Sequence, residues 1–197
     1  MTIESQRQKS HYLDIASLPE SYPTMHLPAE FWELLGRAIA TFGFLEEILG
    51  KAIFAMTATK LYDDEQELTD AYEKWNSVLE KALYDQLGNL ISSYEKAATA
   101  RDIKIADFSS LVAELRSAVD LRNVLCHGSW KFPDELGHSV PLFVNRKMEI
   151  FETAIDVEFL RTTQRAVAEL SCEVINTVTI AGWQFPGTNG PGLVIGG

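Results

Sequence analysis

Basic side chains are few in this chain of 197 residues, where 17 lysines and arginines stand against 28 aspartates and glutamates, for a net charge of −11. Proteins that coat nucleic acid nonspecifically gain affinity from many cations that neutralise phosphates. The acidic balance therefore excludes a broad nucleic-acid-coating surface, and we expect no DNA partner. A small local cluster of cations inside an acidic protein remains open.

Cysteine is almost absent as well. Cys126 and Cys172 are the only two, which excludes a disulfide framework and is typical of a reducing compartment. Cys126 stands beside His127, but adjacent side chains diverge on a helix, and no second cysteine or histidine lies at ligand spacing. We therefore expect neither a metal site nor a cofactor.

Long apolar runs are also missing. The N-terminus lacks the apolar core of a signal peptide. No segment approaches the roughly 18 uninterrupted apolar residues of a membrane span. We expect a cytoplasmic protein with no membrane partner.

The composition that remains is that of a globular protein, with 46% hydrophobic and 23% charged residues. One domain is the natural expectation at this length. Residues 1–28 are polar and proline-bearing and form an N-terminal arm, residues 29–184 hold the helical domain, and residues 185–197 form a flexible tail rich in glycine and proline.

Apolar side chains recur at the spacing of amphipathic helices over four segments, residues 29–56, 66–96, 107–127 and 156–183. Residues 129–151 change to short runs typical of strands, with a tight turn at Asn145-Arg146. The sequence thus predicts an all-α fold: a four-helix up-and-down bundle with a small β-hairpin-like insert at 129–151, between helices three and four.

The most informative stretch ends the third predicted helix. Arg122, Asn123 and His127 lie on its last turns, and Gly128 follows where a helix would stop. A fixed cation, an amide and a titratable imidazole suffice for metal-free phosphodiester chemistry. His127 can exchange a proton near neutral pH, Arg122 can bind a phosphate, and Asn123 can orient the imidazole or bind a phosphoryl oxygen.

A projection of this helix at about 100° per residue separates two features. Arg122 lies within the apolar stripe, whereas His127 lies about 140° away on a polar ridge. The ridge consists of Arg116, Asp120, Asn123 and His127. Arg116 and Asp120 are candidate RNA contacts, and so is Trp130, which could stack on a base. A helix-capping role for His127 and a core position for Trp130 remain alternatives.

Like Arg122, Glu46 is a charged residue on the apolar side of a predicted helix, in this case the first one. A carboxylate there is unfavourable unless it meets a cation or several donors. Arg122 is the obvious partner. The pair could be purely structural, or it could also hold the guanidinium in one orientation for a bound phosphate.

The segment Arg122-Asn123-x-x-x-His127, at the end of a long helix in an all-α domain, resembles the HEPN family, whose signature is an arginine, a polar residue, a few further residues and a histidine. The stretch 41–46 is similar to that family's first helix. The resemblance covers about residues 29–183. It implies a four-helix domain that acts as a homodimeric, metal-independent endoribonuclease, with two copies of the motif lining a shared groove.

The resemblance also implies a setting in prokaryotic defence or toxin–antitoxin systems, with RNA as substrate and an antitoxin or another protein as partner. Arg122, Asn123 and His127 would be the catalytic residues and Glu46 a supporting residue that orients Arg122. Some members of the family lack activity. The alternative function is therefore a non-catalytic dimeric module that binds RNA, a nucleotide or a partner protein.

Overall fold

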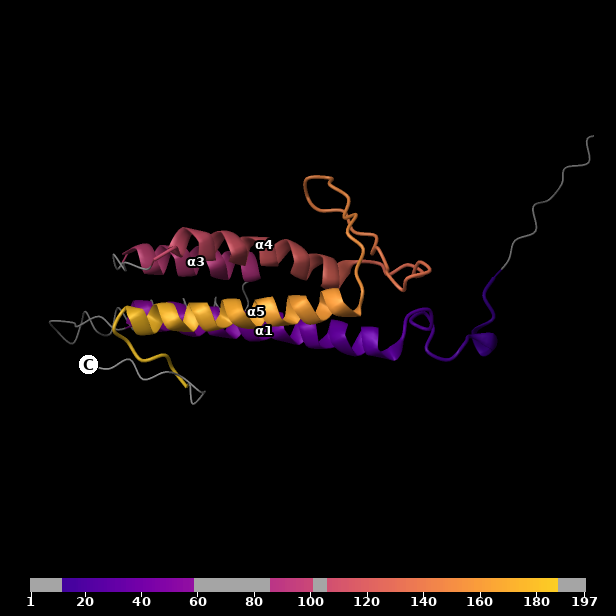
Figure 1. The fold of residues 1–197 in the computed structure, drawn as a ribbon, viewed down its shortest axis with the longest axis horizontal. Coiled ribbons are helices and arrows are strands. Elements are labelled where there is room, and N and C mark those ends of the chain that lie inside the picture. Colours follow the sequence, from indigo (N-terminus) through magenta and orange to yellow (C-terminus); the bar gives the residue numbers. More distant parts are fainter. Residues whose placement is uncertain (1–11, 59–85, 101–105, 188–197) are drawn as a thin grey trace, which may run out of the picture.

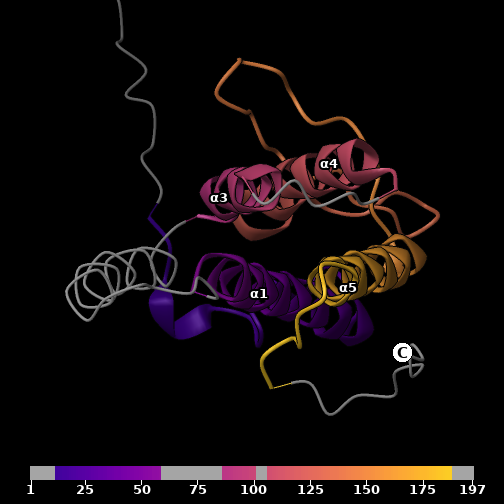
Figure 2. The same cartoon turned by 90° about the vertical axis from the view of Figure 1, so that its left-hand side faces the viewer.

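The structure is a computed structural model that describes residues 12–58, 86–100 and 106–187. Within these ranges the chain forms α1 (Ala29–Ala58), α3 (Leu87–Ala100), α4 (Phe108–His127) and α5 (Val157–Ile180), preceded by the short 3-10 helix η1 (Ile15–Ser17). The four long helices pack in two layers, α3 and α4 over α1 and α5 (Figures 1 and 2). The predicted all-α bundle is confirmed.

Local chemistry explains where the helices begin and end. α1 begins directly after Pro28, a residue that suits the start of a helix because it has no N–H to donate. α5 begins after Asp156, whose side chain accepts a hydrogen bond of 2.7 Å from the N–H of Phe159. α4 ends at His127 and is followed by Gly128, where the sequence predicts that the helix stops.

The second predicted helix, residues 66–96, differs from what the structure shows. Gln86 is not helical; its carbonyl accepts the first hydrogen bonds of α3, from the N–H groups of Asn89 and Leu90. α3 then continues past residue 96 to Ala100. The apolar spacing runs on across Gln86, so periodicity alone does not detect that α3 begins at Leu87. The part of this prediction over residues 66–85 lies outside the described residues.

From α3 through α4 to α5 the helix directions alternate, as in an up-and-down bundle, whereas residues 59–85, between α1 and α3, lie outside the described residues. α1 and α5 run side by side in the same direction, and Glu30 of α1 forms an ion pair with Arg161 of α5 near their starts. α4 runs the opposite way, so that the ring of Phe108 at its start packs on Tyr94 of α3, with ring centroids 5.7 Å apart. Among the described helices, α4 alone opposes the other three (Figure 1).

The core lies along α1, which packs against both α3 and α5. Its largest fully buried side chains are Phe31, Phe42, Leu45, Leu49 and Met56. One buried polar contact joins the two layers: the hydroxyl of Tyr94 in α3 lies 2.8 Å from Oγ1 of Thr177 in α5.

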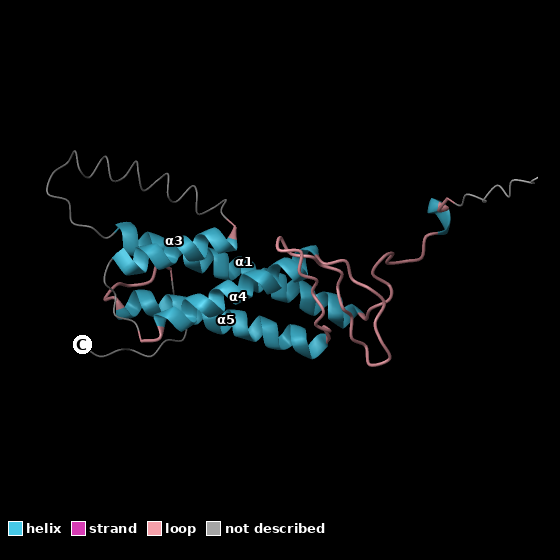
Figure 3. Ribbon diagram, turned by 90° about the horizontal axis from the view of Figure 1, so that it is seen from above, coloured by secondary structure: helices cyan, strands magenta, loops and turns pink. Residues whose placement is uncertain are grey.

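The insert, residues 129–151, contains no strand, which corrects the predicted β-hairpin (Figure 3). It holds isolated antiparallel bridges instead, including Ser129 with Leu142 and Val144 with Ile150. The backbone departs from extended geometry at Gly137 and Met148, where φ is 84° and 64°. Both residues lie in the turns that connect the bridged segments. The predicted turn lies one residue later, at Arg146-Lys147.

The two ends of the chain are only partly described. Residues 12–28 lead away from the bundle toward η1 (Figures 1 and 3). Phe185, at the start of the predicted tail, is 3% exposed and belongs to the core, and residues 188–197 lie outside the described residues. None of the helices in the described ranges is long and apolar enough to cross a membrane.

Candidate functional site

A polar cavity of about 530 Å³ lies where the start of α3, the last turns of α4 and the insert meet. The side chains that carry its chemistry come from α4 and from the insert. They are Asp120, Arg122, Asn123, His127, Arg146 and Lys147. Four of these six were singled out from the sequence, so the structure brings most of the predicted site into one cavity.

Arg122 is held by two partners. Its Nη2 lies 3.7 Å from Oε1 of Glu46 on α1, and its Nη1 donates a hydrogen bond of 3.4 Å to Oδ1 of Asn123. The side chains of Arg122 and Glu46 are each 28% exposed. The ion pair predicted between the first and third helices of the sequence is therefore present, but half-buried rather than buried.

His127 is exposed and is the last residue of α4. The helical projection predicts that Arg122 and His127 belong to separate features, because their side chains diverge by about 140°. The structure instead places both on the wall of one cavity. The insert folds back along the end of α4, so that the side chains of Arg122 and His127 line the same cavity although they point in different directions. The geometry of α4 alone does not predict this packing of the insert.

Gly128 makes this return of the chain possible. A Cβ atom at this position would lie 2.6 Å from the carbonyl oxygen of Val124 and 2.8 Å from Cβ of Pro141. The φ of Gly128 is −66°, which any residue can adopt. Glycine is needed here for space, because the buried Pro141 of the insert packs directly on the end of the helix.

A capped turn presents Arg146 and Lys147 to the cavity. Oδ1 of Asn145 accepts hydrogen bonds from the N–H groups of Lys147, at 2.9 Å, and Glu149, at 3.0 Å, and its Nδ2 donates to Oε2 of Glu149 at 2.7 Å. The sequence analysis missed these two cations. A signal for them exists, because Arg146-Lys147 is the only adjacent pair of basic residues in the chain.

The charges around the cavity favour an anionic ligand. Arg122, Arg146 and Lys147 bring three cations, of which Glu46 neutralises one in part, and Asp120 is the one carboxylate among the cavity residues above. The first residues of α3, from Leu87, also line the cavity, and the start of a helix carries partial positive charge. A locally cationic site thus exists in a chain whose net charge is −11.

Two predicted RNA contacts lie away from this cavity. Arg116 is paired with Glu95 of α3, with Nη2 2.6 Å from Oε2. Trp130 packs edge-on against Phe31 at a ring-centroid distance of 4.9 Å and close to Trp32 at 6.3 Å. Neither Arg116 nor Trp130 lines the cavity, and a role for them in RNA binding stays a prediction.

The described residues contain no group of three or more histidine, cysteine or acidic side chains that could hold a metal ion. Both cysteines are free. Searches against protein-family models, curated proteins and solved structures find no match to this chain. The functional argument therefore depends on the chemistry of the cavity.

Proposed function

We propose that the chain is a metal-independent endoribonuclease of the HEPN type, which cleaves RNA at the cavity between α3, α4 and the insert. The observation that carries the proposal is that Arg122, Asn123 and His127 line one cavity with Arg146 and Lys147. A side chain that can exchange protons near neutral pH thus lies among three cations, which suits a phosphodiester substrate.

The reaction can be written with these groups. His127 accepts the proton of a ribose 2′-OH, the 2′-oxygen bonds to the adjacent phosphorus, and the bond from phosphorus to the 5′-oxygen breaks. The products are a 2′,3′-cyclic phosphate and a free 5′-OH. Arg122 binds the phosphoryl oxygens as their charge grows, and Asn123, which accepts from Arg122, keeps the guanidinium in place.

A second protonated group must donate to the leaving 5′-oxygen. Because one protomer supplies a single imidazole at this cavity, we propose a homodimer in which the second copy of His127 is that donor. If a dilute sample shown to be monomeric cleaved RNA at full specific activity, the shared site would be wrong while the assignment of His127 could stand.

The test of the proposal uses a fluorophore-labelled single-stranded RNA in the presence of EDTA, with detection of the cyclic phosphate end. His127→Gln and Arg122→Gln are each expected to lower the cleavage rate by at least about a hundredfold, as general acid–base and charge-stabilising groups do. Arg161→Gln is the matched control, since Arg161 is also an arginine paired with a glutamate on another helix and does not line the polar cavity. It should leave the rate unchanged.

The alternative is a non-catalytic dimeric module that binds RNA, a nucleotide or a partner protein at the same cavity. The partial neutralisation of Arg122 by Glu46 favours this alternative, because a paired guanidinium binds phosphate less strongly. Under it the wild type cleaves nothing, and Arg146→Gln with Lys147→Gln still weakens RNA binding, lowering the slope of log K against log salt by about 0.7 per cation.

A role in prokaryotic defence or in a toxin–antitoxin pair, with an antitoxin as protein partner, belongs to the same proposal. Under the enzyme hypothesis, expression of the wild type slows bacterial growth and His127→Gln relieves it. Equal toxicity of both proteins at equal abundance would contradict a nuclease toxin.

A further inference from the structure

A second cavity, of about 390 Å³, opens between α4 and α5. It lies on the other side of α4 from the polar cavity, because Leu121, which lines it, and Asn123 of the polar cavity diverge by about 160° around the helix. Any ligand in it would therefore leave the polar cavity open. We call it the α4–α5 groove.

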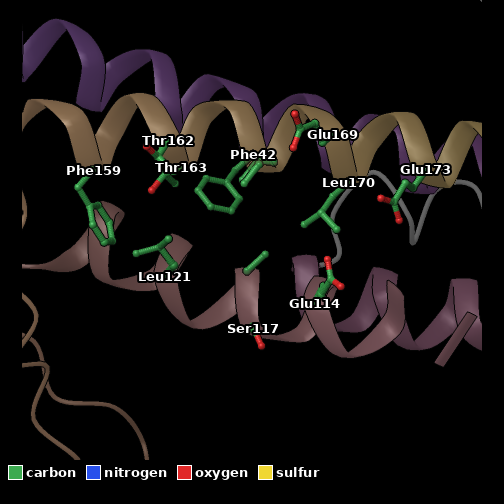
Figure 4. A pocket seen from close by; sticks show the side chains of 13 residues that line it. Phe42, Glu114, Ser117, Leu121, Phe159, Thr162, Thr163, Glu169, Leu170 and Glu173 are labelled. Atoms are coloured by element: carbon green, nitrogen blue, oxygen red, sulfur yellow. The ribbon is translucent and has the colours of Figure 1, made fainter. Parts of the chain in front are cut away.

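The floor of the α4–α5 groove is apolar. Phe42 of α1 lies at its base, between Leu121 of α4 and Leu170 of α5 (Figure 4). Phe159 closes the floor at the end where α5 begins. Apolar side chains that cover this floor and displace water from it would stabilise the complex by roughly 25 cal/mol per Å² of buried apolar surface.

The other end of the groove is acidic. Glu114 of α4 and Glu169 and Glu173 of α5 gather there (Figure 4). Glu169 is paired with Arg165 at 2.8 Å, an exposed contact. Among the described residues, no cation pairs with Glu114 or Glu173 within 4.0 Å. The groove therefore joins an apolar floor to uncompensated negative charge.

We propose that the α4–α5 groove binds an amphipathic helix of a partner protein, whose apolar face is followed by lysine or arginine. The stretch of α5 from Phe159 to Glu173 rises by about 21 Å, which matches about four turns of a bound helix. Apolar side chains at positions i, i+4 and i+7 would cover the floor, and the cations would meet Glu114 and Glu173.

The charge distribution favours such a partner over a second copy of this chain. In a two-fold dimer the groove of one copy would face the groove of the other. The acidic end of each groove would then meet either the acidic end or the apolar floor of the other groove, and both contacts are unfavourable. Like charges brought together at an interface oppose binding. A basic helix avoids this repulsion and also gives Glu114 and Glu173 cationic partners.

The experiment uses the full chain and two synthetic fluorescein-labelled helical peptides of about 16 residues, with the same leucine face and either lysines or glutamates after it. We expect micromolar binding of the lysine peptide by fluorescence anisotropy, and binding of the glutamate peptide at least about tenfold weaker. The double variant Glu114→Gln with Glu173→Gln should weaken binding of the lysine peptide by a similar factor. Glu152→Gln with Glu158→Gln, which removes two exposed carboxylates outside the groove, should not.

Ala166→Trp tests the location, because Ala166 lines the groove, is exposed, and can be enlarged without disturbing the core. It should abolish peptide binding while the thermal melt stays unchanged. Equal binding of both peptides, no binding of the lysine peptide, or full binding to Ala166→Trp would overturn the proposal. So would a concentration-dependent dimer that Ala166→Trp dissociates, which would assign the groove to a second copy. None of these outcomes depends on whether the polar cavity cleaves RNA.

Discussion

Arg122 combines a structural and a chemical role in one side chain. Its partner Glu46 comes from α1, so the pair ties two helices together, and the same guanidinium forms part of the wall of the polar cavity. The sequence analysis placed Arg122 on an apolar stripe. If the ion pair were fully buried there, removing one partner would lower the free energy of unfolding by about 3–5 kcal/mol. The two side chains are 28% exposed and 3.7 Å apart, and solvent at this depth weakens both the attraction and the penalty of losing it.

We predict that Arg122→Gln lowers the free energy of unfolding by about 1 kcal/mol. Chemical denaturation would measure it, and Glu46→Gln and the double variant complete a double-mutant cycle. A coupling energy near zero would show that the pair holds the guanidinium without stabilising the fold. A loss above about 3 kcal/mol would contradict the half-buried geometry.

The insert is the element that turns a helix end into a cavity. It has no regular ladder and depends instead on side-chain capping, by Asn145 around Arg146-Lys147 and by Asp134, which accepts from the N–H groups of Leu136 and His138 at 2.9 Å each. Hydrogen bonding from the N–H of His138 is the largest of the effects that lower the pKa of Asp134. The turn it caps therefore keeps this stabilisation above the ordinary pKa of aspartate and loses it as the pH falls through the lowered value.

Gly128 is the position where the insert and α4 meet most closely. We predict that Gly128→Ala destabilises the protein by about 1–3 kcal/mol, because the new methyl group would meet a backbone carbonyl and a proline ring, neither of which is a flexible chain end. The thermal melt measures this change. Gly36→Ala, at a position of α1 with nothing within 4 Å of the added Cβ, is the matched control and should stabilise slightly.

If the insert positions Arg146 and Lys147, Gly128→Ala should also weaken RNA binding beyond its effect on the folded fraction. Unchanged affinity per folded molecule would mean that the insert reaches the cavity without this close contact.

At the scale of the whole molecule, Tyr94 and Thr177 join the two layers of helices. Oγ1 of Thr177 donates to the carbonyl of Val174 at 2.7 Å, so the proton between the two hydroxyls comes from Tyr94. Burial raises the pKa of Tyr94 to about 12, above its ordinary value of 10.0, and the negative charge of Glu173 raises it further. The folded state therefore favours the neutral form of the Tyr94 side chain.

A raised pKa of this kind contributes stability that is fully present below about pH 10 and is lost as the pH rises toward about 12, because the unfolded chain ionises first. We predict that Tyr94→Phe costs about 1 kcal/mol at pH 7 through the lost hydrogen bond, and flattens the fall of stability between pH 10 and 12. Denaturation at each pH measures both effects. Tyr22→Phe, at an exposed tyrosine outside the bundle, should leave the alkaline profile unchanged.

The sequence by itself determined the all-α class, the bounds of α1, α4 and α5 to within a few residues, the end of α4 just before Gly128 and the pairing of Glu46 with Arg122. These features follow from interactions between residues close in the chain, or from a charge that needs a partner on an apolar face. Only the tertiary structure decided the start of α3 at Leu87, the irregular insert, and the meeting of Arg122 and His127 with Arg146 and Lys147 in one cavity. Those depend on how a loop packs back on a helix end, which is set by the space left between elements and not by the spacing of side chains along any one of them.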